Sequence, residues 1–169
     1  MRVWNVIAAL FHATASQYYS GKGDLEKARK KLDQALSLDE NPEIYVLAYD
    51  ARLMTREDRH REALDRIREC LARLPEEMDA DQLHVWATCR FFLAAYDYRK
   101  GYEELANLAE QANSARQKAS WASKYFLPSM PEKALREIFG RRVEIKSYSF
   151  VPGLNPAHRV LYHSDFDAR

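Results

Sequence analysis

Histidines, cysteines and serines are the residues of this sequence that could do acid–base, metal or nucleophilic chemistry, and their spacing matches no recognised catalytic pattern. The five histidines are His12, His60, His84, His158 and His163. None of them belongs to an H-E-x-x-H arrangement, and no glycine-rich phosphate loop is present. The stretch from Gly21 to Asp24 lacks the spacing of such a loop and is typical of a turn. We therefore predict no catalytic residue, no metal site and no cofactor.

The two cysteines, Cys70 and Cys89, each lie inside an apolar pattern with helical spacing. No second cysteine or histidine stands near either one at the separation that a zinc site uses. We expect both to be reduced thiols that are buried as small hydrophobic residues.

Residues 52–73 form the most basic stretch of the chain and raise the question of nucleic-acid binding. Seven arginines occur there, but acidic residues are interleaved, and Glu57–Arg61 and Glu62–Arg66 have the i,i+4 spacing of helical ion pairs. The whole chain carries 26 basic and 25 acidic residues, whereas proteins that bind polyanions need a basic face. The pattern indicates a solvated helix that pairs its own charges, and we expect no nucleic acid as a partner.

We expect helices to carry the histidines, cysteines and arginines discussed above, because the chain is poor in glycine and proline, the residues that end helices. Only five glycines and six prolines occur among 169 residues, and 47% of the residues are hydrophobic. Asp24 and Asn41 are candidate N-caps, and Pro42 suits the first position of a helix. No apolar run approaches the roughly 18 residues that a membrane span needs. We predict helices over residues 3–20, 24–38, 42–55, 58–74, 81–99, 102–120 and 131–140.

The N-terminal stretch, MRVWNVIAALFHATASQ, resembles a weak secretory signal. It has a basic start, an apolar run from Val3 to Phe11 and an Ala13-Thr14-Ala15 triplet. We favour an amphipathic first helix instead, because cleavage after Ala15 would remove most of a helix that an internal repeat requires. The expected location is cytoplasmic, and a real signal would make the protein secreted or periplasmic.

The helical pattern stops after Gly140. Residues 143–150 alternate apolar and polar side chains as a strand does, and the residues after them carry no helical stripe. A single strand is unstable without a partner, so this tail docks on the helical body, pairs with another chain or stays flexible. We predict a helical domain over residues 1–140 and a non-helical C-terminal tail over residues 141–169.

An internal repeat links the second and fourth predicted helices. A shift of 35 residues places small residues on small ones and apolar residues on apolar ones. The matched residues are Ala28, Leu32, Ala35 and Leu36 and, in the same order, Ala63, Ile67, Cys70 and Leu71. A further shift of 42 residues reaches Leu105, Ala109 and Ala112. One helical hairpin cannot bury its apolar faces alone, so such units must stack, and about three are needed for stability.

The stretch from Ala9 to Pro42 resembles a tetratricopeptide repeat, a helix–turn–helix unit of 34 residues. The residues that carry the resemblance are Tyr19, Gly23, Asp24, Ala28, Leu32, Ala35 and Leu36. The second unit has Asp58 where the turn glycine would stand, and the third has Leu105 at the small position. The resemblance covers residues 9–119. It implies an all-α fold, a short right-handed superhelix of about three helical hairpins with a capping helix.

In proteins of this family, the first helices of successive hairpins line a concave groove that binds peptides or partner segments. Carried onto this chain, the resemblance places the following residues in the groove: Gln17, Tyr45, Tyr49, Arg52, Arg56, Arg90, Phe91 and Tyr98. Aromatic and arginine side chains are favoured at binding hot spots, and arginine suits carboxylates. The expected function is that of a protein–protein interaction module or scaffold for an acidic peptide with apolar side chains, not of an enzyme or a membrane protein.

Two alternatives stay open beside this expectation. In the first, the aromatic surface is the interface of a self-associating structural protein, a homodimer or larger homo-oligomer. In the second, the chain is a regulatory or enzymatic subunit whose site lies under the C-terminal tail.

Overall fold

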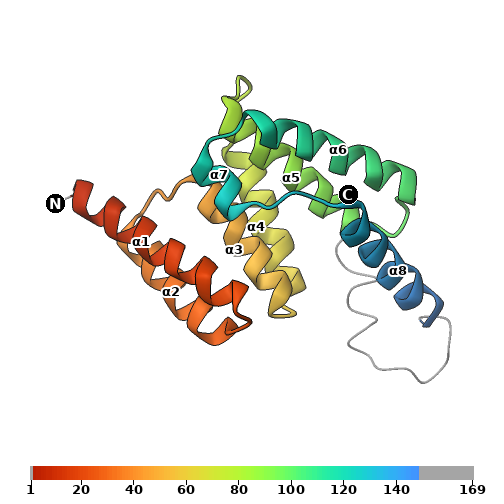
Figure 1. Ribbon diagram of the computed structural model, residues 1–169, viewed down its shortest axis with the longest axis horizontal. Helices are drawn as coiled ribbons and strands as arrows, with labels where there is room; N and C mark the ends of the chain where they lie inside the picture. Colours follow the sequence, from red (N-terminus) through yellow and green to blue (C-terminus); the bar gives the residue numbers. More distant parts are fainter. Residues whose placement is uncertain (1, 149–169) are drawn as a thin grey trace. The chain divides into compact units, whose positions relative to one another are not determined.

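The fold is entirely α-helical in the part of the chain that the structure describes. The computed structural model describes residues 2–148; Met1 and residues 149–169 lie outside the described part. Residues 2–148 form eight helices and no strand (Figure 1), which confirms the predicted all-α class. No helix in this range combines the length and the apolar character that crossing a membrane requires. The chain divides between Arg73 and Leu74 into two compact units, here called unit 1 and unit 2.

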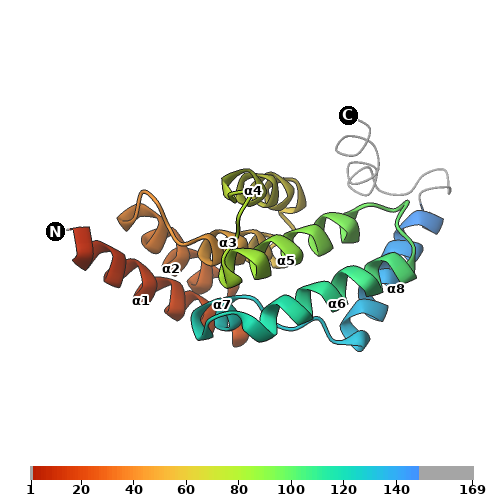
Figure 2. The same cartoon turned by 90° about the horizontal axis from the view of Figure 1, so that it is seen from above.

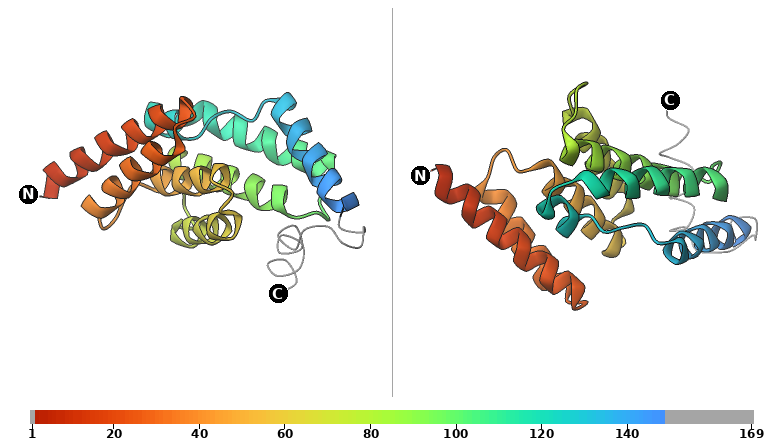
Figure 3. Two further views of the ribbon diagram at one scale, coloured as in Figure 1. Left: turned by 90° about the horizontal axis from the view of Figure 1, so that it is seen from below. Right: turned by 45° about the horizontal axis from the view of Figure 1, so that its top comes forward.

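Unit 1 consists of two helical hairpins. α1 (Arg2–Gly21) packs along α2 (Leu25–Leu38), and α3 (Ile44–Arg56) packs along α4 (His60–Arg73) (Figure 3). The second helix of each hairpin buries small and branched residues at the positions matched by the 35-residue shift. These residues are Ala28, Leu32 and Ala35 on α2 and Ala63, Ile67 and Cys70 on α4. Small side chains at a helix contact allow the two axes to approach closely.

The two hairpins of unit 1 turn in the same way, 35 residues apart. In the first turn the Asp24 N–H donates to the Tyr19 carbonyl at 3.1 Å, and the residues 35 positions later make the same bond at 2.9 Å. The left-handed backbone position of the turn falls at Gly23 (φ 82°) and at Asp58 (φ 58°). The correspondence found in the sequence is therefore also a correspondence of backbone geometry.

We expect Asp58→Gly to raise the free energy of unfolding of unit 1 by roughly 0.5–1 kcal/mol, because glycine adopts a positive φ without the steric cost of a Cβ. The loss of the contact between Asp58 and His60 should change stability little, since the Asp58 side chain is 93% exposed and lies 3.5 Å from His60 Nε2. Gly23→Ala should lower that free energy by about 1 kcal/mol, although nothing lies within 4 Å of the added Cβ. Urea denaturation measures both changes, and a destabilised Asp58→Gly would contradict the shared turn.

The predicted helix starts are right for α2 and wrong for α3. Asp24 caps α2 by accepting a hydrogen bond from the Lys27 N–H at 3.1 Å. α3 begins later than predicted, with Glu43 and not Asn41 at its cap. The Asn41 N–H is held instead by the Asp39 carboxylate at 3.0 Å. This local side-chain turn competes with the helix and delays its start.

Unit 2 contains a third hairpin and two further helices. α5 (Ala80–Tyr96) and α6 (Tyr102–Lys118) lie side by side (Figures 1 and 2). α7 (Trp121–Phe126) and α8 (Glu132–Tyr148) both contact α5, and α8 also contacts α6. The core between α5, α6 and α8 consists of Phe91, Ala94, Leu105, Leu108, Ala109 and Leu135.

α8 continues past Gly140, where the sequence predicted a helix end followed by a strand. Residues 141–148 are helical, so the non-helical tail and the strand are wrong over that stretch, and residues 149–169 lie outside the described part. A glycine inside a helix costs only about 1 kcal/mol relative to alanine, which makes it a weak stop. Beyond it, Arg142 buries its guanidinium against the end of α5, and this tertiary contact favours the continued helix.

Candidate functional site

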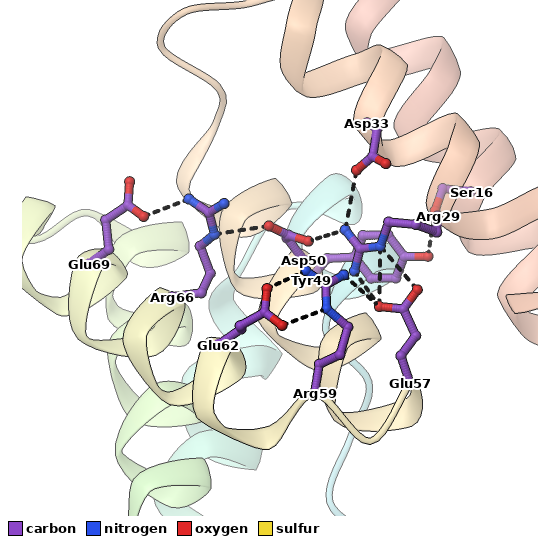
Figure 4. Close-up of polar contacts among 10 residues, drawn as sticks. All are labelled: Ser16, Arg29, Asp33, Tyr49, Asp50, Glu57, Arg59, Glu62, Arg66 and Glu69. Carbon is purple, nitrogen blue, oxygen red and sulfur yellow. Dashed lines mark hydrogen bonds and ion pairs between the residues drawn. The ribbon is translucent and has the colours of Figure 1, made fainter. Parts of the chain in front are cut away.

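Two of the five predicted binding residues of unit 1, both tyrosines, lie inside the protein. Tyr49 is 1% exposed, and its hydroxyl is 2.9 Å from the Ser16 hydroxyl (Figure 4). Burial raises the pKa of Tyr49, and the hydrogen bond with Ser16 opposes that rise. Tyr45 is also buried, and Gln17 is half-buried. The Tyr49 ring therefore joins α1 to α3 and is not presented to a ligand at the surface.

Arg52 and Arg56, one turn apart on α3, are the predicted residues of unit 1 that carry positive charge. Arg52 is half-buried; burial first, and then the charge of Arg56, lower the pKa of Arg52. Arg56 is exposed, and its Nη1 donates to the Ser20 carbonyl at 2.7 Å and also contacts the Ser20 hydroxyl. Both arginines stay candidates for contact with an acidic ligand.

A buried ion-pair network joins α2, α3 and α4 in unit 1 (Figure 4). Asp50 on α3 is fully buried between two arginines: Arg29 Nη1 lies 2.7 Å from its Oδ1, and Arg66 Nε lies 2.9 Å from its Oδ2. The Arg66 N–H is not aligned on Oδ2 for a hydrogen bond, so that contact is an ion pair only. Arg29 also binds Glu57, with Nε 3.0 Å from one carboxylate oxygen and Nη2 2.7 Å from the other.

The network has a structural effect on unit 1. Burial acts to lower the pKa of Arg29, but its hydrogen bonds with Glu57 and Asp50 outweigh burial and raise the pKa above its ordinary value. Asp50 and Glu57 are both engaged by arginine, so neither offers a carboxylate for chemistry. Because Arg29 comes from the first hairpin and Asp50 and Arg66 from the second, the network fixes how the two hairpins of unit 1 pack.

The predicted binding residues of unit 2 are divided between the core and the surface. Phe91 is fully buried in the core of α5, α6 and α8, so it does not act as a surface anchor. Arg90 is exposed, and its guanidinium lies 4.6 Å from the centre of the Trp86 ring in a cation–π contact. Tyr98 is half-buried, with its ring 5.7 Å from the guanidinium carbon of Arg142.

A pocket of about 260 Å³ lies between α5 and α6, and Trp86 is part of its wall; we call it the Trp86 pocket. Its lining residues are Leu83, Trp86 and Ala87 from α5 and Gln111, Ser114, Ala115 and Lys118 from α6. Within the described residues, the side chains of Gln111, Ser114 and Lys118 make no hydrogen bond or ion pair. Trp86 is not among the binding residues predicted from the sequence, although its i,i+4 spacing to Arg90 is a usable signal. The pocket combines an aromatic wall with uncommitted polar groups, as binding sites do.

A serine and a histidine meet in unit 2 without forming an activated nucleophile. His84 Nδ1 lies 2.8 Å from Ser123 Oγ, and both residues are buried, at 1% and 0% exposed. Burial lowers the pKa of His84 to about 4, so the ring is neutral at pH 7. The Asp81 carboxylate binds the Ser120 hydroxyl, at 2.6 Å, rather than orienting the histidine. These contacts fasten α7 to α5.

The outer face of α1 is a second exposed surface. Val3, Trp4, Ile7 and Phe11 are 70%, 74%, 52% and 71% exposed. Residues four apart lie on one side of a helix, so Val3, Ile7 and Phe11 form a stripe. Contiguous apolar surface of this kind often marks an interaction site.

Within residues 2–148, no three or more His, Cys, Asp or Glu side chains form a group that could hold a metal ion. Cys70 and Cys89 are both buried, as predicted, and are not joined to each other. Comparisons of the chain with protein-family models, with curated proteins and with solved structures find no match.

Proposed function

We propose that the chain is a protein–protein interaction module of tetratricopeptide-like architecture that binds a peptide or a partner segment. Three features support the architecture. The hairpins of unit 1 share one turn geometry 35 residues apart, their second helices bury matching small residues, and unit 2 adds a third hairpin. Repeated hairpins present side chains in regular rows, which suits the recognition of extended segments.

The observation that carries the proposal is the Trp86–Arg90 pair beside the Trp86 pocket. Tryptophan and arginine are the residues most enriched at binding hot spots, and here one stacks on the other at 4.6 Å. The volume of about 260 Å³ is below the roughly 300 Å³ at which small-molecule pockets begin. That size fits one large side chain of a peptide better than a whole cofactor.

The positive charge around the Trp86 pocket favours peptides of a particular charge. Lys118 lines the pocket, Arg90 covers the Trp86 ring, and no acidic residue is among the described lining residues. Complementary charge therefore favours an acidic partner. The proposed ligand carries an apolar side chain, which packs on Trp86 and Leu83, next to a carboxylate, which pairs with Arg90 or Lys118.

The predicted residues of unit 1 are a separate candidate contact surface within that unit. There, Arg52 and Arg56 would pair with acidic groups of a partner, and Gln17 would donate or accept a hydrogen bond. Tyr45 and Tyr49 would support this surface from beneath, because both are buried.

Selection of a random peptide library on the full chain tests the proposal. We expect the selected peptides to combine an aromatic or large aliphatic residue with Asp, Glu or a C-terminal carboxylate. Trp86→Ala should weaken the binding of a selected peptide by about thirtyfold, the effect of losing an anchor worth about 2 kcal/mol. Arg90→Gln should weaken binding less and should remove most of its salt dependence, because an exposed charge is screened.

Trp121→Ala is the matched control for Trp86→Ala. Trp121 lies in the same unit, is 75% exposed and does not line the Trp86 pocket. Its loss should leave peptide affinity unchanged. A selected peptide that binds Trp86→Ala as tightly as the wild type, or that loses affinity with Trp121→Ala, would place the site elsewhere.

Self-association through the outer face of α1 is a second candidate function. It is favoured by the exposure of Val3, Trp4, Ile7 and Phe11, which a second copy of the chain would cover. Sedimentation velocity over a wide range of protein concentration separates the two candidates, because only self-association gives a mass that grows with concentration. The alternative of a site under the C-terminal tail depends on residues 149–169, which lie outside the described part.

A further inference from the structure

Arg142 of α8 occupies an unusual position at the end of α5 in unit 2. Its Nη2 donates to the Lys100 carbonyl at 2.8 Å and to the Asp97 carbonyl, and the residue is only 6% exposed. The rings of Tyr98 and Phe139 flank the guanidinium, with centres 5.7 Å and 5.8 Å from its carbon. An arginine near the C-terminal end of a helix interacts favourably with the last carbonyls. The two hydrogen bonds of Nη2 are interactions of this kind.

The other two guanidinium nitrogens of Arg142, Nε and Nη1, lack a hydrogen-bond acceptor among the described residues. Both nitrogens are buried. An arginine does not lose its proton in a protein, so burying these donors without an acceptor is unfavourable. The nearby Asp97 carboxylate does not supply the acceptor, because Arg99 holds it with contacts of 2.9 Å and 3.1 Å. Burial accordingly lowers the pKa of Arg142.

A small pocket of about 150 Å³ lies beside this guanidinium; we call it the Arg142 pocket. Its lining residues are Tyr98, Arg99, Lys100, Gly101, Phe139, Arg142 and Val143. Three of them are cations. Among the described residues, Asp97 pairs with Arg99 and Glu104 pairs with Lys100 at 2.5 Å.

We infer that the Arg142 pocket binds an oxyanion, a phosphate or carboxylate group that accepts hydrogen bonds from the guanidinium and pairs with the surrounding cations. The oxygens of both groups accept charge-assisted hydrogen bonds from single guanidinium N–H groups. The pocket is separate from the Trp86 pocket, since the two share no lining residue.

Gly101 allows a test that leaves Arg142 in place. It lines the pocket, has φ −80° and ψ 173°, which any residue adopts, and an added Cβ would meet nothing within 4 Å. It is also the N-cap of α6, a position at which both Asp and Asn are preferred over glycine. Gly101→Asp and Gly101→Asn should therefore both fold, and they differ only in whether a negative charge stands in the pocket.

The experiment titrates the full chain and both variants with inorganic phosphate, and separately with acetate, at constant ionic strength balanced with chloride. NMR of the Arg142 Nε–H reports binding at this pocket. We expect saturable binding with a shift of that signal for the wild type and for Gly101→Asn. Binding should be at least tenfold weaker for Gly101→Asp, because the added charge lies close to the anion. Whichever anion binds more tightly identifies the group. No saturable shift with either anion, or equal affinity for Gly101→Asp and Gly101→Asn, would overturn the inference and leave Arg142 as a helix cap alone.

Discussion

Asp50→Asn should lower the free energy of unfolding of unit 1 by about 3 kcal/mol, the lower part of the range for breaking a buried ion pair. The substitution keeps the size of the side chain and removes the charge that lies between Arg29 and Arg66. Asp50 is fully buried, whereas the side chains of Arg29 and Arg66 are 16% and 26% exposed. In the variant the two arginines can regain some hydration, which limits the decrease in the free energy of unfolding. Urea denaturation followed by circular dichroism measures the change.

Asp33→Asn is the matched control for Asp50→Asn. Asp33 faces the same arginine, with Arg29 Nη1 3.4 Å from its Oδ1, but its side chain is 60% exposed. An exposed ion pair contributes roughly 0–1 kcal/mol, so this variant should be close to the wild type. Equal and small effects at the two aspartates would mean that the network does not hold the hairpins of unit 1 together.

Phe91→Ala should lower the free energy of unfolding of unit 2 by roughly 3–5 kcal/mol, because truncating a fully buried phenylalanine removes its contacts and leaves a cavity. Phe91 is 0% exposed and packs with Leu105 and Leu135. Thermal and urea unfolding of the variant measure the loss. The same experiment tests the role of Phe91, which the family resemblance places in a binding groove and the structure places in the core.

Phe92→Ala is the neighbouring control for Phe91→Ala. Phe92 is half-buried at the edge of the same cluster, with its ring centre 5.8 Å from that of Phe91. Its truncation should cost roughly 1–2 kcal/mol, because part of its surface is exposed to water in the folded state. A Phe91→Ala variant that unfolds like the wild type but binds no peptide would show that Phe91 is a binding residue after all.

The sequence predicted the features of the fold that are encoded locally. Asp24 was recognised as a cap because its side chain reaches a backbone N–H three residues later. The 35-residue repeat can be recognised in the sequence because Ala28 and Ala63 occupy equivalent buried positions that require a small side chain. The predicted helix end at Gly140 is wrong because the contact that extends α8, between Arg142 and the residues that follow α5, joins residues far apart in the chain.

The candidate sites were less predictable, because burial decides which aromatic residue a ligand can touch. The resemblance to tetratricopeptide repeats places Tyr49 and Phe91 in a binding groove, yet both are at most 1% exposed. The Asp50 network was missed because its arginines lie 21 residues before Asp50 and 16 residues after it, at no local spacing. Trp86 is not predicted from the sequence, although its distance of four residues from Arg90 fits one face of a helix.

Fluorine NMR of the full chain labelled with fluorotryptophan tests the central proposal most directly. The chain has three tryptophans, and they report on different places: Trp4 on the outer face of α1, Trp86 in the Trp86 pocket and Trp121 on α7. Titration with the tightest peptide from the library selection should shift the Trp86 signal and leave the other two in place. A shift of Trp4 or Trp121 with an unmoved Trp86 signal would contradict the account.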